Sequence, residues 1–220
     1  MKMKLGLLLP CIVLLLTGCH GHFHYELGGI QGSGIKASET REVGEFTGID
    51  VRCSANIRLH DGKEQSVTVE CDDNLLELIT TEVKDNKLVV TTKEPISTRI
   101  GINVTINVPQ LESIHISGSG DVQAEDVDAT ALTLSISGSG DIKITGTAEK
   151  IDLNINGSGD ADLSELVVQE ATVQVSGSGD VVVHATDKLI ATVNGSGDIR
   201  YIGEPEVQKS VSGSGDIQPE

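Results

Sequence analysis

The tetrapeptide Gly-Ser-Gly-Asp at residues 118–121 recurs five more times, and it decides how the rest of the sequence is interpreted. The copies begin at residues 118, 138, 157, 177, 195 and 213, so successive copies are 18 to 20 residues apart. Internal repeats of this length are typical of solenoids, in which each repeat forms one coil that stacks on its neighbours. The tetrapeptide therefore predicts a repeating architecture for the second half of the chain.

Apolar residues alternate with polar ones on both sides of each tetrapeptide. In the first copy Ile114 and Ile116 precede it, and Val122 and Ala124 follow it. Alternation with a period of two is the pattern of a β-strand that has one buried face. Each repeat thus predicts a strand, a Gly-Ser-Gly corner and a second strand. The predicted fold class is all-β: a right-handed parallel β-helix over residues 111–218, preceded by an irregular, hairpin-containing β part over residues 41–110.

The corner glycines are predicted to be structural. Glycine reaches backbone angles that other residues adopt only with strain, so two glycines in each corner permit a sharp turn that repeats in register. These positions are Gly118, Gly120, Gly138, Gly140, Gly157, Gly159, Gly177, Gly179, Gly195, Gly197, Gly213 and Gly215.

The repeated aspartates are expected to form one column along the solenoid: Asp121, Asp141, Asp160, Asp180, Asp198 and Asp216. Two interpretations stay open. In the first, each carboxylate accepts hydrogen bonds from nearby backbone amides of its corner, as in Asx turns. In the second, the column binds Ca²⁺, because coils about 4.8 Å apart place like charges side by side and Ca²⁺ prefers oxygen ligands. No other cofactor is expected.

The first 18 residues are predicted to be a lipoprotein signal peptide. Basic residues precede an apolar run, residues 5–16, that is long enough for a signal peptide but too short to span a membrane. The run ends in Leu16-Thr17-Gly18-Cys19, which resembles a bacterial lipobox. We expect Cys19 to be lipidated, with ordinary secretion as the alternative. Because His20 and not Asp follows, the expected location is the outer membrane, and the glycine-rich residues 19–40 are predicted to be a flexible tether.

Two cysteines remain in the mature chain, Cys53 and Cys71. They lie on alternating segments on either side of His60-Asp61-Gly62-Lys63, a turn signal. A hairpin centred on Gly62 would place them opposite each other. We therefore predict a cross-strand disulfide, with two buried thiols as the alternative.

Composition bounds the function. The formal net charge is −17, which repels the phosphates of nucleic acid. Acidic residues are abundant, but no pair stands out as a glycosidase pair, and aromatic residues, the usual platforms for sugar rings, make up only 2% of the chain. No catalytic residue is therefore assigned, and the chain is predicted not to be an enzyme.

The sequence resembles a bacterial family described as putative auto-transporter adhesin, head GIN domain. The resemblance covers roughly residues 32–218 and depends on the lipobox, the repeats and these segments: Gly32-Ser33-Gly34, Glu39-Thr40-Arg41, Phe46-Thr47-Gly48-Ile49-Asp50-Val51, Asp73-Asn74-Leu75-Leu76 and Thr81-Glu82-Val83. It implies a right-handed β-helix on the cell envelope and carries no catalytic residues.

The resulting expectation is a non-enzymatic, lipid-anchored envelope protein that acts as an adhesin or binding scaffold for a glycan or protein of the envelope or of a host surface. One alternative is a periplasm-facing structural or Ca²⁺-binding lipoprotein. A polysaccharide-active β-helix enzyme is the third.

Overall fold

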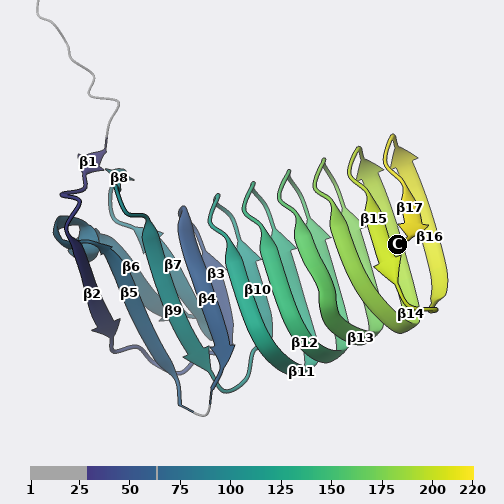
Figure 1. Ribbon diagram of the computed structural model, residues 1–220, viewed down its shortest axis with the longest axis horizontal. Coiled ribbons are helices and arrows are strands. Elements are labelled where there is room, and N and C mark those ends of the chain that lie inside the picture. Colours follow the sequence, from purple (N-terminus) through teal and green to yellow (C-terminus); the bar gives the residue numbers. More distant parts are fainter. Residues whose placement is uncertain (1–28, 63) are drawn as a thin grey trace, which may run out of the picture.

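The computed structural model describes residues 29–62 and 64–220, and nearly all of this part of the chain is β-strand (Figure 1). The first strands are β1 (Ile30–Gln31), β2 (Lys36–Arg41), β3 (Gly48–Val51), β4 (Ala55–Asp61), β5 (Ser66–Asp72), β6 (Ile79–Lys84), β7 (Lys87–Thr92), β8 (Ile96–Ser97) and β9 (Ile102–Val108). The repeats contain β10 (Ser113–Ile116), β11 (Val122–Ile136), β12 (Ile142–Ile155), β13 (Ala161–Val175), β14 (Val181–Gly195), β15 (Ile199–Ile202), β16 (Glu206–Gly213) and β17 (Ile217–Pro219). A short 3-10 helix, η1 (Asp73–Leu78), lies between β5 and β6.

The predicted signal peptide and Cys19 lie outside the described residues. Within residues 29–62 and 64–220, no helix has the length and apolar character needed to cross a bilayer.

The predicted all-β solenoid is confirmed. Strands β10 to β14 pair in parallel, each with the strand of the next coil. The long strands β11 to β14 bend halfway, so that the coils form two layers of parallel strands, one in front of the other in Figure 1. We call the layer that begins each long strand the first sheet and the layer that ends it the second sheet. In β11 the bend coincides with a register shift after Ala124 and a positive φ of 58° at Asp126.

An aliphatic core fills the space between the two sheets. The residues two positions before the tetrapeptides are almost completely buried: Ile116, Ile136, Ile155, Val175 and Val193. In the sixth copy Val211 is 45% exposed, because no further coil of the described chain covers it. The Nζ of Lys209, whose register partner in β14 is Ala191 of the core, donates instead to the carbonyl oxygen of Ile217 at 2.9 Å.

The solenoid begins earlier than residue 111, so the predicted boundary at 110/111 is wrong. Strand β3 pairs in parallel with β10, and β4 pairs in parallel with the start of β11. Residues 48–61 therefore form a first coil without the tetrapeptide. The chain then forms β5 to β9 before it reaches β10. Of these strands, β7 pairs in parallel with β3 and β9 in parallel with β4, so both sheets of the solenoid continue into this region.

The predicted hairpin around Gly62 is also wrong. Strand β9 lies between β4 and β5, parallel to the former and antiparallel to the latter. The expected opposition of Cys53 and Cys71 does not occur, and both are free thiols in place of the predicted disulfide.

The predicted tether over residues 19–40 is wrong for its described end. Strand β1 pairs in parallel with β8, and β2 pairs along its whole length with β5 in antiparallel fashion. The turn Asp85-Asn86, with positive φ values of 50° and 63°, joins β6 and β7 into a hairpin, and Asp72-Asp73-Asn74 opens η1.

Candidate binding groove

The glycines of each corner are required by contact between coils. An added Cβ on Gly140 would lie 2.0 Å from the carbonyl oxygen of Gly120, and one on Gly138 would lie 2.0 Å from that of Gly118. Positive φ occurs among the tetrapeptide glycines at Gly177, Gly195 and Gly213, whereas the others do not need it. The expected reason, special backbone angles, is therefore wrong for most corners: the backbones of successive coils come too close for any side chain.

The tetrapeptide aspartates form the expected column and link the coils through hydrogen bonds. The backbone N–H of Asp141 donates to Oδ1 of Asp121 at 3.0 Å, and that of Asp160 donates to Oδ1 of Asp141 at 2.8 Å. The same bond joins Asp180 to Asp160, Asp198 to Asp180, and Asp216 to Asp198. Each of the first five carboxylates thus accepts from the amide of the next coil. Only Oδ1 of Asp216 accepts a local bond of the kind that the Asx interpretation expected, from the N–H of Ile217 at 2.8 Å.

The Ca²⁺ interpretation stays a prediction. Among the described residues, no three or more His, Cys, Asp or Glu side chains gather in a group that could hold a metal ion. In the column, one oxygen of each of the first five carboxylates is already bonded to a backbone amide.

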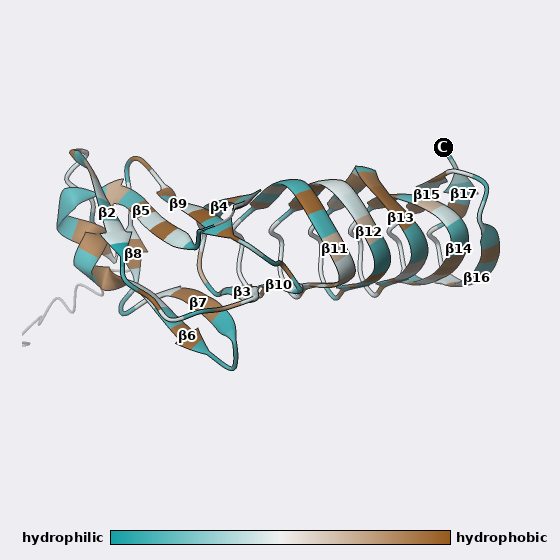
Figure 2. Ribbon diagram, turned by 90° about the horizontal axis from the view of Figure 1, so that it is seen from below, coloured by the Kyte–Doolittle hydropathy of each residue, from teal (hydrophilic) through white to brown (hydrophobic). Residues whose placement is uncertain are grey.

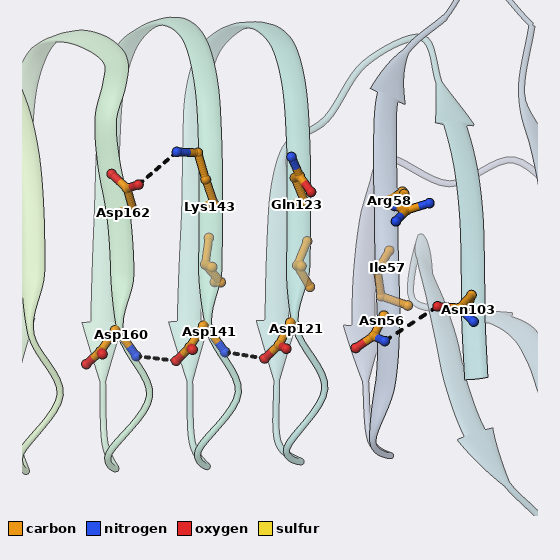
Figure 3. A pocket seen from close by; sticks show the side chains of 12 residues that line it. Asn56, Ile57, Arg58, Asn103, Asp121, Gln123, Asp141, Lys143, Asp160 and Asp162 are labelled. Carbon is orange, nitrogen blue, oxygen red and sulfur yellow. Dashed lines mark hydrogen bonds and ion pairs between the residues drawn. The ribbon is translucent and has the colours of Figure 1, made fainter. Parts of the chain in front are cut away.

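A groove of about 460 Å³ follows the aspartate column on the outside of the first sheet (Figure 3). Side chains line it in two rows that cross the coils. One row, next to the corners, contains Asn103, Asn56, Asp121, Asp141 and Asp160. The other, two residues farther along each strand, contains Arg58, Gln123, Lys143 and Asp162.

Ion pairs hold part of the second row in place. The Nζ of Lys143 lies 3.0 Å from Asp162 and 3.2 Å from Glu165, and these contacts raise the pKa of Lys143. A hydrogen bond from the Ser164 hydroxyl, followed by the contact with Lys143, lowers the pKa of Asp162. Both groups are charged at neutral pH, so Asp162 is not suited to act as a general acid.

The end of the groove nearest the N-terminus was not predicted. Asn103 and Asn56 continue the aspartate column across β9 and β4, and the amide of Asn56 donates to Asn103 at 3.4 Å. A signal for this end exists in the sequence: Val51 and Ile57 are six residues apart, as are Ile116 and Val122. Aligning these spacings would have placed Asn56 at the position of Asp121.

The groove can bind a polar ligand through both signs of charge and through amides. Pockets of this volume are typical of small-molecule or oligomer subsites. The row next to the corners carries three carboxylates, and the second row carries Asp162 with the cations Arg58 and Lys143. The strands of these two cations are two coil spacings apart, or roughly 10 Å.

A second site missed by the sequence is structural. Asp72 is completely buried and accepts hydrogen bonds from the Gly34 amide, the Thr98 hydroxyl and the Arg99 amide. These bonds, with Thr98 making the largest contribution, lower the pKa of Asp72 to about 2. The carboxylate thereby joins the segment between β1 and β2 to the loop after β8.

The two cysteines are in environments that keep them protonated. Burial raises the pKa of Cys53 to about 11, and burial also raises the pKa of Cys71. The Cys71 thiol donates to the Thr98 hydroxyl at 3.7 Å. Because the thiolate is the reactive form, neither residue is suited to nucleophilic or metal-binding chemistry.

Comparison with known proteins gives a family and a set of related folds. The profile of the family described as "Putative auto-transporter adhesin, head GIN domain" matches residues 45–205. A search of curated proteins finds no significant match.

Several solved structures share the fold. A crystal structure of a putative adhesin from Bacteroides fragilis NCTC 9343 is 27% identical, has a TM-score of 0.73, and covers 87% of this chain and 100% of its own. A putative lipid binding protein and a putative adhesin from Parabacteroides distasonis ATCC 8503 are 22% and 23% identical, with TM-scores of 0.60 and 0.59. Each covers 87% of this chain and 99% of its own, and at these identities they support the fold alone.

Proposed function

The chain belongs to the family described as putative auto-transporter adhesin, head GIN domain, and from this premise we propose that it is a non-enzymatic, lipid-anchored adhesin of the bacterial cell envelope. The relative from Bacteroides fragilis, also described as a putative adhesin, supports the same assignment, because it matches over 87% of the chain.

The observation that carries the binding role is the register of the outer side chains. Apart from register shifts near the bends, parallel pairing repeats each outward position once in every coil, at intervals of about 4.8 Å. Such rows offer many equivalent contacts to an extended partner, and many weak contacts together can give firm attachment. The groove along the aspartate column adds a place where one part of a ligand can be held more closely.

Lipid anchoring follows from Leu16-Thr17-Gly18-Cys19. Acyl chains on Cys19 would hold the protein at a membrane, because each buried methylene contributes about 0.8 kcal/mol. We expect Cys19→Ala to abolish metabolic labelling with a radioactive fatty acid and to move the protein from the membrane fraction to the soluble one. Persistence of the label in this variant would contradict the anchor.

The proposed partner is a glycan or protein of the envelope or of a host surface. Nucleic acid is excluded from the proposal, because a net charge of −17 opposes a phosphate backbone. The absence of enzymatic activity is proposed from the family description and from the ion pairs that hold Lys143 and Asp162 of the groove.

An epitope attached after Glu220 tests the outward orientation. On the adhesin proposal, an antibody labels intact cells as strongly as permeabilised ones. Labelling only after permeabilisation would contradict it and would favour a structural lipoprotein that faces the periplasm.

A further inference from the structure

The outside of the second sheet forms a surface that is almost free of charge. We call it the neutral face and define it by three rows of outward side chains on β10, the ends of β11 to β14, β16 and the residues that follow them. The rows are Ser113, Thr133, Asp152, Thr172, Ile190 and Gln208; His115, Ser135, Asn154, Gln174, Thr192 and Ser210; and Ser117, Ser137, Asn156, Ser176, Asn194 and Ser212. Apart from Asp152, His115 and Ile190, all of them carry a hydroxyl or an amide.

The charge of the molecule lies elsewhere. On the outside of the first sheet, the aspartate column and the adjoining row with Lys143, Asp162 and Arg200 are mostly charged. The row that borders the neutral face on the side of the bends is also charged, with Lys150 and Glu170 paired at 3.0 Å. The chain as a whole has a net charge of −17, so the neutral face differs from the rest of the surface of these coils in having almost no charged side chains.

The polar groups of the neutral face are available to a ligand. Thr172 and Gln174 at its centre are exposed, and their side chains have no hydrogen-bond partner among the described residues. Hydroxyls and amides both donate and accept hydrogen bonds. The face repeats them at about 4.8 Å from coil to coil and at about 7 Å along each strand.

We infer that the neutral face binds an extended, uncharged polysaccharide that lies across the coils. Charge selects this class of partner: an anionic polymer is repelled by the net charge, and a cationic one is drawn to the aspartate column of the first sheet. The hydroxyls of a neutral polysaccharide match the donors and acceptors of the face. This inference rests on the proposed binding function and names its surface and partner.

The mode of binding follows from the lack of aromatic side chains on the face. Without rings for sugars to stack on, each sugar unit contributes little, and attachment depends on the number of coils that one polymer spans. We therefore expect long polymers to bind much better than short oligosaccharides of the same sugar.

Affinity electrophoresis of the full-length protein in neutral detergent tests the inference. The gels contain dextran, hydroxyethyl cellulose, glucomannan or soluble starch as neutral polymers, and polygalacturonate as an anionic one. We expect retardation by at least one neutral polymer and none by polygalacturonate. The double variant Thr172→Glu/Gln174→Glu should weaken the retarding affinity about tenfold or more, because the carboxylates must lose water against an uncharged partner.

The matched control is Gln169→Glu/Gln218→Glu, which adds the same charge at two exposed positions that belong neither to the neutral face nor to the lining of the groove. It should leave retardation unchanged, and both variants should melt like the wild type. Retardation by none of the four neutral polymers would overturn the inference, as would an equal loss in both variants, which would show that added charge weakens binding wherever it lies. Sedimentation that changes from dimer to monomer in the first variant would instead make the face a contact between copies.

The outcome of this experiment does not depend on the cellular location of the protein. Retardation in the gel together with a periplasmic epitope would support the neutral face as a polysaccharide site and contradict the adhesin proposal. No retardation together with an epitope on the cell surface would support the adhesin proposal and contradict binding by the neutral face.

Discussion

The N-terminal region and the repeat array both use aspartate carboxylates to join segments of the chain, but in opposite ways. In residues 29–112 one carboxylate, Asp72, is completely buried and collects three donors from distant segments. In the array none of the column aspartates is fully buried, and each of the first five, such as Asp141, accepts one amide of the next coil. The first region depends on a contact that occurs once, and the second on a modest contact that recurs in every coil.

The difference shows which substitutions each region tolerates. One hydrogen bond of the column can be lost while those of the neighbouring coils persist, because each coil contacts only the adjacent ones. A side chain added at a corner is tolerated less well, because the corner backbones leave no space between coils. Four changes, in order of decreasing expected effect, sharpen this contrast.

The largest effect is expected from Gly140→Ala. The new Cβ would lie 2.0 Å from the oxygen of Gly120 and 2.9 Å from its carbon, and backbone atoms cannot yield without separating two coils. We expect a loss of about 3 kcal/mol or more in the free energy of unfolding, measured by urea denaturation. Gly44→Ala is the matched control, because nothing lies within 4 Å of its Cβ position, and it should change stability by less than about 0.5 kcal/mol. Equal effects of the two changes would refute the stacking argument.

The second change, Asp72→Asn, tests the buried carboxylate through pH. Folding lowers the pKa of Asp72 from 3.8 to about 2, so its ionised form stabilises the fold above pH 3.8, and this contribution is lost as the pH falls through about 2. We expect the variant to melt at a lower temperature than the wild type at pH 7. The gap between their melting temperatures should close between pH 3.8 and about 2.

Asp126→Asn serves as the control for this pH series. Asp126 is exposed and has a φ of 58°, which asparagine also tolerates, so its melting curve should follow that of the wild type at every pH. A constant gap between the wild type and Asp72→Asn over the whole series would mean that the charge of Asp72 does not stabilise the fold.

The third change removes one contact of the column. Asp160→Ala deprives the amide of Asp180 of its 2.7 Å acceptor, and we expect a loss of about 1 kcal/mol in urea denaturation. Asp160→Asn keeps an oxygen acceptor and removes one of the adjacent like charges, so it should be close to neutral. If both variants lost the same stability, the charge and not the hydrogen bond would be the important property.

The smallest effect is expected from Ca²⁺. Because the carboxylates of the column already accept amides, melting in excess CaCl₂ and in EDTA should give the same temperature. A higher melting temperature in Ca²⁺ that disappears in Asp160→Asn would establish the cation column instead.

Much of the array could be predicted because its signals are local and repeated. The alternation around each tetrapeptide gave the strands, and the regular spacing of Ile116, Ile136 and Ile155 gave the core column. The acceptor role of the aspartates was also foreseen, although the donors come from the next coil.

The N-terminal region was harder because its contacts join distant segments. Nothing near Gly62 signals that β9, forty residues later, separates β4 from β5, and the predicted disulfide failed with that pairing. Asp72 begins a polar Asp-Asp-Asn run that is typical of a solvent-exposed helix start. Its burial depends on Gly34 and Thr98, which sequence spacing does not connect to it.

The backbone contact between corners has a consequence for how such proteins can change length. Every coil presents the same glycine surface above and below, so the units are interchangeable, and an in-frame duplication of one repeat would meet neighbours that already fit it. Each duplication would extend the rod by about 4.8 Å. With the N-terminal end held at the membrane as proposed and the array running away from it (Figures 1 and 2), repeat number becomes a ruler that sets how far the molecule reaches from the cell.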